Sequence, residues 1–437
     1  MAQIRPFRGL VYDVSRAGAI GELITPPYDV ISPERQKAYH DRNPHNIIHL
    51  DFGLERPGDD ERENKYVRAA RMLDEWLDEG SLLRGERPAF YVLEQEYTLE
   101  DGRRRKRTGF IGLVKLEELG SGKVLPHERT LSKPRADRLN LLRATRANLS
   151  QVFALFGDPA GGVEQELEKA SRRPPLFEVD DYQRVTNRLW VLEDEDAIRR
   201  VSQVMRDKVL FIADGHHRYE TALAYRDEMR KTFPGARGDQ PYDYVMMMMV
   251  NMDVQEMTIL PTHRVVRGLP AGFEEDFLGR SKEFFDVLEV DRGQVHKKVS
   301  EMQDLPVELH QLGFLGKEGP LRLLRLKDHG IMGTLVPPEY SDALRMLDVT
   351  VLHSLVFDHL LGIDTEIALL RGDISFEKST EACARQVEDG HYQAAFFLRG
   401  TKMEQMREIA ARRERMPQKS TFFYPKLPTG LVMYRLD

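Results

Sequence analysis

The chain has 437 residues, of which 41% are hydrophobic and 31% are charged, as in globular proteins and unlike disordered chains. A single hydrophobic core stops growing at about 250 to 300 residues, so we expect two or three subdomains. The 64 Lys and Arg residues against 71 Asp and Glu give a net charge of -7, which argues against a protein that coats nucleic acid through bulk charge.

The lack of apolar targeting segments and the single cysteine indicate the compartment. No run approaches the length of about 18 apolar residues that a membrane span needs, and the first residues contain no apolar stretch of signal-peptide length. Cys383 is the only cysteine, which rules out an internal disulfide and a paired-thiol redox centre. We therefore expect a cytoplasmic protein without a membrane partner, in which Cys383 is a core residue of a helix.

The first hundred residues contain signals for two helices. Ser32 followed by Pro33 is typical of a helix N-terminus, with an N-cap and a proline at the first helical position. Apolar residues at helical spacing predict an amphipathic helix over 61–79 that stops at Gly80.

A β-hairpin follows these helices. The β-rich segments 89–99 and 108–116 flank a turn at 100–102, which is typical of a hairpin. Five consecutive cations, Arg103–Arg107, come directly after the turn. On a hairpin tip of an acidic protein we interpret them as a solvated face rather than a nucleic-acid patch.

Between residues 138 and 250 the apolar pattern alternates between helical and extended periods. Helices are expected over 138–148, within an insertion at 157–206 and after Asp194, and strands over 152–156, 209–213 and 244–250. The last strand includes the run Met246–Met249, which we interpret as core-filling residues rather than a soft metal site.

The strongest chemical signal is the segment 209–223. An apolar strand runs into Asp214 and Gly215, and a helix begins within a residue or two, so backbone N–H groups and the positive helix end meet at one point. Arg218 adds a guanidinium fork suited to phosphate oxygens. This pattern predicts an anion site.

The remaining side chains of this turn extend that prediction. His216 and His217 supply donors whose charge depends on their surroundings, and Asp214 is placed to hold Mg²⁺ or to orient a histidine. In the alternative interpretation Asp214 caps the helix and both histidines lie on the surface.

A second constellation lies upstream, at 123–135. Glu128 follows His127, and the hydroxyl of Thr130 and the cation of Lys133 come within a few residues. Such a group can supply a base for a hydroxyl nucleophile beside charges that neutralise phosphate. The alternative is a charged loop after a strand.

Two later segments are candidates to complete the site. His263 and Arg264 follow the methionine-rich strand and place an imidazole beside a guanidinium. The proline- and aromatic-rich tail adds hydroxyls and cations that suit nucleotide phosphates, although a packed terminal strand explains the same pattern. Its candidate residues are Lys419, Ser420, Thr421 and Lys426.

These motifs resemble those of a known superfamily. The Gly-His-His-Arg turn at 215–218 resembles the Gly-Cys-His-Arg turn of sulfiredoxins and the phosphate-binding turn of ParB-type proteins. Pro126-His127-Glu128 together with the 214–218 turn resembles free serine kinases of that superfamily. From Thr25 to Thr421 the chain is similar to a large SerK-like family of bacterial and archaeal proteins. Sulfur repair is excluded, because His216 stands where sulfiredoxin needs its cysteine.

The resemblance implies roles for individual residues. Glu128 corresponds to the base that acts on the substrate hydroxyl, with His127 beside it. Asp214, His216, His217 and Arg218 correspond to the group that binds nucleotide phosphates and metal. The implied cofactors are Mg²⁺, held by Asp214, and ATP or ADP as the phosphoryl donor.

The resemblance also implies the fold. We expect an α+β protein with a ParB/sulfiredoxin-like core of mixed sheet and helices, elaborated by N-terminal and C-terminal α/β subdomains. The expected division is an N-terminal subdomain over 1–118, the core over 119–265 with its insertion at 157–206, and a C-terminal subdomain over 266–437. The tail of the last subdomain is expected to return to the site.

The sequence therefore predicts a small-molecule kinase that phosphorylates a hydroxyl, with free L-serine as the first acceptor to try. Its partners are a nucleotide and a small hydroxyl-bearing substrate, and the oligomeric state is open, a homo-oligomer included. Two alternatives remain. One is a ParB-like nucleotide-binding switch or nucleic-acid-associated protein, which the acidic balance disfavours. The other is a metal-dependent hydrolase with three of His127, Glu128, Asp214, His216 and His217 on one ion.

Overall fold

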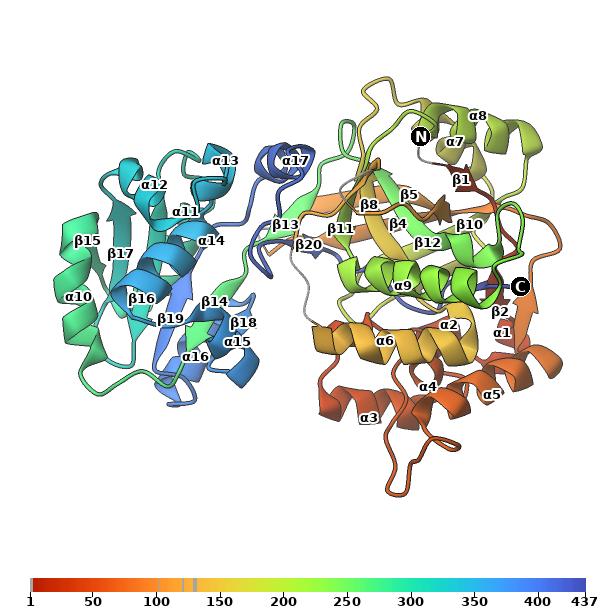
Figure 1. Cartoon of the computed structure of the whole chain (residues 1–437), viewed down its shortest axis with the longest axis horizontal. Helices are drawn as coiled ribbons and strands as arrows, with labels where there is room; N and C mark the ends of the chain where they lie inside the picture. The colour runs from red at the N-terminus through yellow and green to blue at the C-terminus, as the bar shows by residue number, and fades with distance from the viewer. Residues whose placement is uncertain (1–2, 101, 120–121, 129–131) are drawn as a thin grey trace. The chain divides into compact units, whose positions relative to one another are not determined.

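The computed structural model describes residues 3–100, 102–119, 122–128 and 132–437, which divide into two units (Figure 1). Unit 1 holds the described residues of 3–126 and 132–257 together with Pro425–Asp437. Unit 2 holds His127, Glu128 and Thr258–Tyr424. The chain is thus a mixed α/β protein, and the three-part division expected from the sequence stays a prediction.

Unit 1 is built on a mixed sheet, nine-stranded over the described residues. The strands run in the order β6-β11-β8-β12-β5-β4-β10-β9, and β1 pairs with β5. β12 is parallel to β8, and β11 is parallel to β6, whereas the other pairs are antiparallel. The strand bounds are β1 (Ile4–Arg5), β4 (Phe90–Thr98), β5 (Arg104–Lys115), β6 (Val124–Leu125), β8 (Val152–Phe156), β9 (Phe177–Asp180), β10 (Thr186–Leu192), β11 (Leu210–Asp214) and β12 (Tyr244–Asn251).

Helices cover this sheet. In Figure 1, α6 and α9 lie side by side, and α5 packs against α6 on the side away from α9, while α7 and α8 form a separate pair. The helices of unit 1 are α1 (Val14–Ala17), α2 (Ile20–Leu23), α3 (Pro33–Arg42), α4 (Ile48–Asp51), α5 (Lys65–Asp78), α6 (Ser132–Thr145), α7 (Gly162–Ala170), α8 (Glu195–Met205) and α9 (His216–Thr232). Two short strand pairs complete the unit, β2 (Leu10–Tyr12) with β3 (Leu82–Arg84), and β7 (Ala147–Asn148) with β21 (Tyr434–Arg435).

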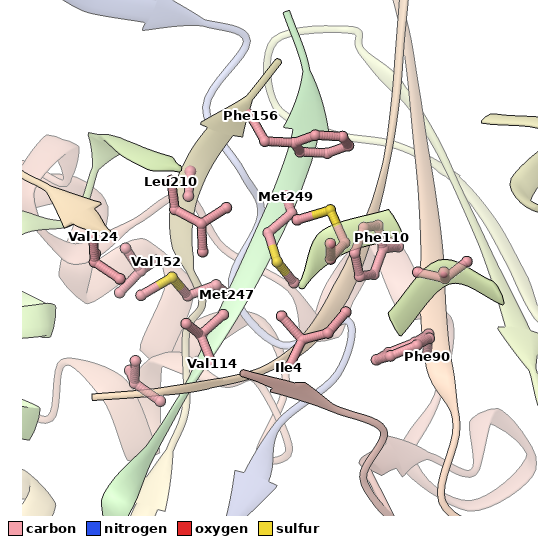
Figure 2. Packing of buried hydrophobic residues seen from close by; sticks show 14 of the residues in the cluster. Ile4, Phe90, Phe110, Val114, Val124, Val152, Phe156, Leu210, Met247 and Met249 are labelled. Carbon is pink, nitrogen blue, oxygen red and sulfur yellow. The ribbon is translucent and has the colours of Figure 1, made fainter. Parts of the chain in front are cut away.

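The core of unit 1 explains the four consecutive methionines. All of Met246–Met249 are buried in β12, a central strand between β5 and β8. Met247 and Met249 pack with Phe110 and Val114 on one face (Figure 2), and Met246 and Met248 point to the other because side chains alternate along a strand. Since both faces are covered, the strand is continuously apolar. The core-filling interpretation is confirmed.

Unit 2 is a second sheet with a core on each face. Its six strands, all paired antiparallel, run in the order β15-β17-β16-β19-β14-β18. One apolar cluster includes Phe277 and Phe357, and the other includes Val299 and the buried Cys383. The strands of unit 2 are β13 (Thr258–Leu260), β14 (His263–Val266), β15 (Phe285–Val290), β16 (Gln311–Gly316), β17 (Leu321–Leu326), β18 (Ile374–Glu377), β19 (Ala394–Phe397) and β20 (Phe422–Tyr424), of which β13 and β20 form a separate pair.

The helices of unit 2 are mostly short. They are α10 (Phe273–Phe284), α11 (Val295–Met302), α12 (Met332–Leu335), α13 (Asp342–Arg345), α14 (Asp348–Thr350), α15 (Thr365–Arg371), α16 (Thr380–Glu388) and α17 (Met403–Ala411), with a π-helix at Val351–Leu360. None of the helices in the described ranges is long and apolar enough to cross a membrane.

Most of the predicted local elements are confirmed. Ser32 caps α3 by accepting a hydrogen bond from the backbone of Arg35, and α5 ends two residues before Gly80. The predicted hairpin is β4 and β5. The insertion contains its predicted helix α7, but it also contributes β9 and β10, which extend the edge of the sheet.

One prediction about the hairpin is wrong for a single residue. The cations were expected to form a solvated face at its tip, and Arg103, Arg104 and Lys106 are exposed, but Arg107, which lies inside β5, is fully buried. The strand simply continues from the cations into its apolar half. The last cation of the run therefore points into the protein.

Candidate functional site

The predicted anion turn has the expected backbone. β11 ends at Asp214, Gly215 follows with a φ of +88°, and α9 begins at His216. A side chain at position 215 would be strained at this φ, and a Cβ there would lie 2.9 Å from Arg218 Nε. Glycine is thus required twice, for the left-handed turn and for the space that the Arg218 guanidinium occupies.

Two cations flank the Asp214 carboxylate. Arg218 Nη2 lies 2.8 Å from Asp214 Oδ2, and Lys426 Nζ lies 2.7 Å from Asp214 Oδ1. Arg218 also donates to the backbone carbonyl of Gln151. The structure therefore brings the predicted tail residue Lys426 to the predicted turn, and the positive end of α9 begins at the same place.

Arg107 is a third cation near Asp214, and sequence reasoning missed it. It donates to the side-chain oxygen of Gln95 and, at 2.6 Å, to the carbonyl of Pro425. Its guanidinium carbon lies 4.6 Å from the centre of the Phe153 ring. Burial lowers the pKa of Arg107 to about 10, and Tyr97 and then Asp214 oppose this shift. The signal was its position, where the cation run enters the apolar half of a strand.

Arg107 also has unused hydrogen-bonding capacity. Its Nε and Nη1 atoms are buried and have no hydrogen-bond partner among the described residues. A buried unsatisfied donor costs about 1 to 3 kcal/mol, and more when it is charged. Such donors are retained where a ligand or an ordered water satisfies them.

The two histidines of the turn lie in the first turn of α9. His216 is buried and His217 is half-buried. The surface placement of both histidines in the alternative interpretation therefore does not hold for His216.

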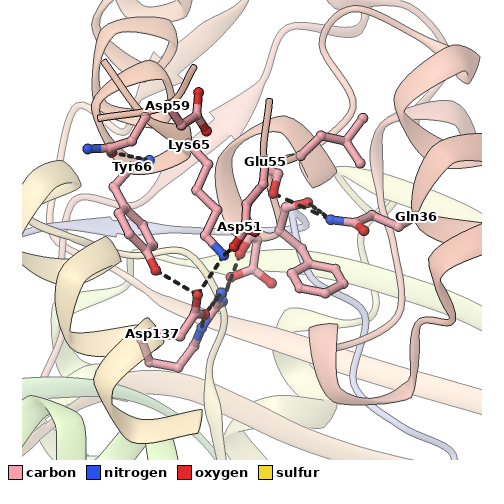
Figure 3. A network of polar contacts seen from close by, with 12 residues as sticks. Gln36, Asp51, Glu55, Asp59, Lys65, Tyr66 and Asp137 are labelled. Carbon is pink, nitrogen blue, oxygen red and sulfur yellow. Dashed lines mark hydrogen bonds and ion pairs between the residues drawn. The ribbon is translucent and has the colours of Figure 1, made fainter. Parts of the chain in front are cut away.

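An ionic network, partly buried, joins side chains of α4, α5 and α6 (Figure 3). Arg138 on α6 binds Asp51 at 3.2 Å and Asp137 at 2.6 Å, and it covers the ring of Tyr28. Burial raises the pKa of Asp51, while Arg138 and then Arg218 oppose the shift. The Arg218 guanidinium is thus within electrostatic reach of this network, which sequence reasoning did not detect.

The network is anchored at α5. Lys65 lies 2.9 Å from Asp137 and 3.1 Å from Glu55, and the Tyr66 hydroxyl donates to Asp137 at 2.8 Å (Figure 3). Burial alone would raise the pKa of Asp137, but Arg138, Lys65 and Tyr66 outweigh it and lower the value to about 2. These contacts hold α6 and α5 beside the turn.

In unit 2, the predicted base is held by the tail. Glu128 Oε1 accepts hydrogen bonds from the backbone N–H and the hydroxyl of Thr421, at 3.0 and 2.9 Å. His127 Nε2 lies 2.8 Å from the same hydroxyl oxygen. Since that hydroxyl donates to Glu128, its oxygen accepts the proton of His127 Nε2.

The two residues of this pair differ in their exposure to solvent. His127 is fully buried, whereas the side chain of Glu128 keeps 14% of its surface exposed. The backbone beside them is fixed by a bridge between Glu128 and Met416. Thr421, predicted as a nucleotide ligand, therefore orients the carboxylate of the predicted base.

The segment at 262–266 divides into a structural histidine and a buried arginine. His263 Nδ1 accepts from Leu398 N at 3.2 Å, so its Nε2 carries the proton toward the Thr380 hydroxyl. Burial, followed by the charge of Arg264, lowers the pKa of His263 to about 3. A neutral imidazole whose two nitrogens are used in the core is a structural residue, which disfavours His263 as a phosphate ligand.

Arg264 holds the tail loop. It donates to the carbonyls of Gln418 and Lys419 at 3.2 and 3.1 Å. Lys419 has a φ of +54°, and the Ser420 hydroxyl donates to the Pro417 carbonyl at 2.6 Å. The predicted residues Lys419 and Ser420 are thus parts of a tight loop.

Several predictions about ligands remain untested. Thr130 lies outside the described residues, as does the side chain of Lys133. Over the described ranges, no group of three or more His, Cys, Asp or Glu side chains is placed to hold a metal ion, and the hydrolase alternative stays a prediction.

Comparison with known proteins identifies the family. A family model described as "Protein of unknown function (DUF1015)" matches residues 4–350, which is most of the chain. The chain belongs to the DUF1015 family. No curated protein matches it significantly.

Solved structures resemble this DUF1015 protein only at low identity. A free serine kinase in complex with AMP is 11% identical with a TM-score of 0.35, covering 70% of this chain and 92% of its own. A conserved hypothetical protein from Pyrococcus furiosus has the same identity and TM-score, at 70% and 90% coverage. SbnI from Staphylococcus aureus, truncated at its C-terminus, is 10% identical with a TM-score of 0.33, at 72% and 84% coverage.

Proposed function

We propose that this protein is a small-molecule kinase that transfers a phosphoryl group from ATP or ADP to a hydroxyl. The observation that carries the proposal is the cation cluster at the turn, where Arg218 and Lys426 bind Asp214 and Arg107 lies within its electrostatic reach. Three cations and the positive end of α9 exceed what one carboxylate needs, so the turn is suited to the phosphates of a nucleotide.

The nucleotide phosphates would share these cations with Asp214. In phosphoryl transfer, charge spreads over the phosphoryl oxygens in a largely dissociative transition state, and catalysis consists of positioning and electrostatic stabilisation. Arg218 is pre-organised for this task, because its guanidinium is already fixed by Asp214 and the Gln151 carbonyl. Less conformational entropy is then lost on binding.

Glu128 is the proposed base. The acceptor oxygen forms a bond to the terminal phosphorus, the bond from that phosphorus to the leaving nucleotide oxygen breaks, and Glu128 takes the hydroxyl proton. The Thr421 contacts fix Glu128 Oε1, and part of the side chain is exposed. Transfer requires Glu128 and the 214–218 turn to act on the same pair of substrates.

Asp214, the magnesium ligand predicted from the sequence, is occupied by cations. Both carboxylate oxygens form ion pairs, with Lys426 and Arg218, and an ion on Asp214 would have to displace one of these cations. As arranged here the donor set does not fit a metal ligand, and Mg²⁺ usually needs a carboxylate oxygen besides phosphates and waters. No step is therefore assigned to the metal, which stays a prediction.

The acceptor, the core fold and the compartment belong to the same proposal. Free L-serine is the first acceptor to try, the region around the turn is proposed to be ParB/sulfiredoxin-like, and the protein is proposed to act in the cytoplasm. The acceptor and the core fold follow from the motifs at 126–128 and 214–218, and the compartment follows from the single cysteine.

A substrate screen tests the function. ATP and ADP are offered as donors against serine, related amino acids and polyols, with wild type, Glu128→Gln and Arg218→Ala. We expect transfer to at least one acceptor by the wild type, lost in Glu128→Gln while nucleotide still binds. Turnover that neither substitution changes would contradict the proposed site. Nucleotide binding without transfer to any acceptor would favour the ParB-like switch.

A further inference from the structure

A pocket in unit 2 lies beside Arg264 and has no assigned ligand. It encloses about 400 Å³ of space, part of it open to solvent, and a water-sized group has about 20 Å³ in which to move. One ordered water needs about 10 to 15 Å³ on the same scale, so the pocket admits one small polar group but not a nucleotide. The polar residues that line it are Thr262, Arg264, Asp348, Arg399, Thr401, Lys402, Gln405 and Ser420.

Two donors of this pocket lack partners. The hydroxyl of Thr262 and the Nε of Arg264 are buried, and neither has a hydrogen-bond partner among the described residues. Thr262 is 7% exposed and Arg264 1% exposed. Each unsatisfied buried donor costs about 1 to 3 kcal/mol, so these two donors, on residues that line one pocket, favour an acceptor there, either an ordered water or a ligand.

The charge of Arg264 gives the sign of that ligand. Its hydrogen-bond acceptors are the backbone carbonyls of Thr262, Gln418 and Lys419, and over the described residues its guanidinium forms no ion pair with a carboxylate. Burial lowers the pKa of Arg264 to about 9, and Glu128 opposes this shift. A buried guanidinium that forms no direct ion pair is stabilised further by an anion in contact with it.

The other charged residues of the pocket are already matched. Arg399 forms a two-bonded ion pair with Asp348, at 2.7 and 2.9 Å, and it also binds the carbonyls that precede Val307. Lys402 donates to the Gln303 carbonyl at 2.9 Å. Asp348 is therefore neutralised within the pocket wall, and the charge of Arg264 is not.

We propose that this pocket binds the oxyanionic group, a carboxylate or a phosphate, of the acceptor substrate, with Thr262 Oγ1 and Arg264 Nε as donors. The identification of the ligand as the acceptor substrate rests on the proposed kinase function, whereas the anion site itself does not. It gives the substrate class as hydroxy acids, hydroxy amino acids included, or phosphorylated alcohols.

The position of the pocket within unit 2 agrees with this class. Arg264 interacts electrostatically with Glu128, and it binds the carbonyls of Gln418 and Lys419, three and two residues before the Thr421 that orients that carboxylate. A substrate held by its anion at Arg264 would present its hydroxyl on the side of Glu128.

A conservative pair of variants tests the pocket. Thr262→Val removes the unpartnered hydroxyl at nearly constant shape, and Thr350→Val removes another buried hydroxyl without a partner, on a residue that does not line the pocket. Neither loses a hydrogen bond, so both should keep the wild-type Tm or raise it slightly, which shows that they fold.

Binding is measured by calorimetry with L-serine, serinol and inorganic phosphate. Serinol keeps the hydroxyl and ammonium of serine but lacks the carboxylate. We expect at least one of the two anions to bind and serinol not to bind. Thr262→Val should raise the Kd of the anion about 5- to 10-fold, while Thr350→Val should have the Kd of the wild type. Binding of serine alone assigns the carboxylate, and binding of phosphate alone assigns a phosphorylated acceptor.

The inference is overturned if neither anion binds, if serinol binds as well as serine, or if Thr262→Val binds anions like the wild type. Phosphate retained at the Asp214 turn is recognised by its indifference to Thr262→Val. Because these readouts need no turnover, the kinase function can fail in the substrate screen while the anion pocket stands, and the reverse also holds.

Discussion

Arg107 in unit 1 and Arg264 in unit 2 are two versions of the same arrangement. Each is fully buried on a strand, lies over a phenylalanine ring, and donates to backbone carbonyls of the C-terminal tail. Each keeps donors without partners, and burial lowers the pKa of each. Each also interacts with one of the two carboxylates that the proposed mechanism uses.

The difference lies in those carboxylates. Asp214, near Arg107, is bound by two further cations, whereas Glu128, near Arg264, is held by hydrogen bonds from Thr421. The first arrangement concentrates positive charge and suits phosphates. The second orients a carboxylate without neutralising it through those bonds, which suits a base. The comparison teaches that similar buried arginines can accompany carboxylates in different settings, one paired with cations and one held by hydrogen bonds.

The largest effect is expected at Glu128. Glu128→Gln keeps the shape and the contact with Thr421 but cannot accept a proton, so kcat should fall by about 10²- to 10⁴-fold. The Kd of the nucleotide should stay within about 2-fold of wild type, because the amide keeps the side chain in place. Steady-state kinetics and calorimetry measure the two quantities. Equal losses in kcat and in nucleotide affinity would contradict the assignment of Glu128 to proton transfer and of the Asp214 turn to nucleotide binding.

The second-largest effect is expected at Arg218, at the turn, and not at other arginines of the same helix. Arg218→Ala should raise the Kd of the nucleotide about 10- to 100-fold, because a hydrogen bond to a charged group contributes about 1.5 to 3 kcal/mol. The matched control is Arg226→Ala on the same helix, where the arginine pairs with Glu118 and Asp227. Calorimetry should find the control unchanged, and a comparable loss in both variants would remove Arg218 from the site.

The two buried arginines can then be compared directly. Arg107→Met should raise the Kd of the nucleotide about 5- to 20-fold, since it removes one charge-assisted contact near the turn. Arg264→Met should leave that Kd unchanged. Circular dichroism establishes that each variant folds. If both substitutions raise the Kd of the nucleotide equally, the two arginines do not have different roles.

A smaller effect is expected at Thr421. Thr421→Val removes one of the two hydrogen bonds to Glu128 and should lower kcat about 3- to 10-fold without changing the nucleotide Kd. Thr421→Ser should restore kcat, because the hydroxyl returns. A valine variant with wild-type kcat would show that the orientation of Glu128 by this hydroxyl is irrelevant.

The smallest effect is on stability in acid. His263 has a folded pKa of about 3 against 6.5 when unfolded, so below pH 6.5 the unfolded chain gains a proton that the folded chain does not. The free energy of unfolding should therefore fall by about 1.3 kcal/mol between pH 7.5 and 5.5 through this group. Denaturant titrations of His263→Gln should show a flatter dependence by that amount. An identical slope in both proteins would contradict the buried neutral histidine.

Sequence reasoning succeeded where local rules decide the structure. The apolar run of β12 had to be central because Met246–Met249 leave it no polar face, and the glycine at 215 had to turn the chain before α9. The edge strand β9 and its neighbour β10 were missed, although Phe177 and Val179 alternate with acidic residues as a half-buried strand does.

The chemistry was harder to predict because it depends on burial. Arg107 looked like one cation of five, and only the fold buries it over the ring of Phe153, the residue that pairs with Asp214 in the sheet. Thr421 was predicted as a nucleotide ligand, but pairing of the tail with the 127–128 segment puts its hydroxyl on Glu128. His263 and Arg264 are neighbours on one strand, yet one has both ring nitrogens in use and the other lines a pocket.

The most direct test follows the phosphoryl group itself by ³¹P NMR. Wild type and Glu128→Gln are incubated with ATP, and separately with ADP, in the presence of L-serine and the acceptors that bind in calorimetry. We predict that the wild type forms a phosphate monoester as the terminal phosphate of the donor disappears, and that Glu128→Gln forms it at least about 10²-fold more slowly. Release of inorganic phosphate alone, or ester formation at the same rate by both proteins, would contradict the account.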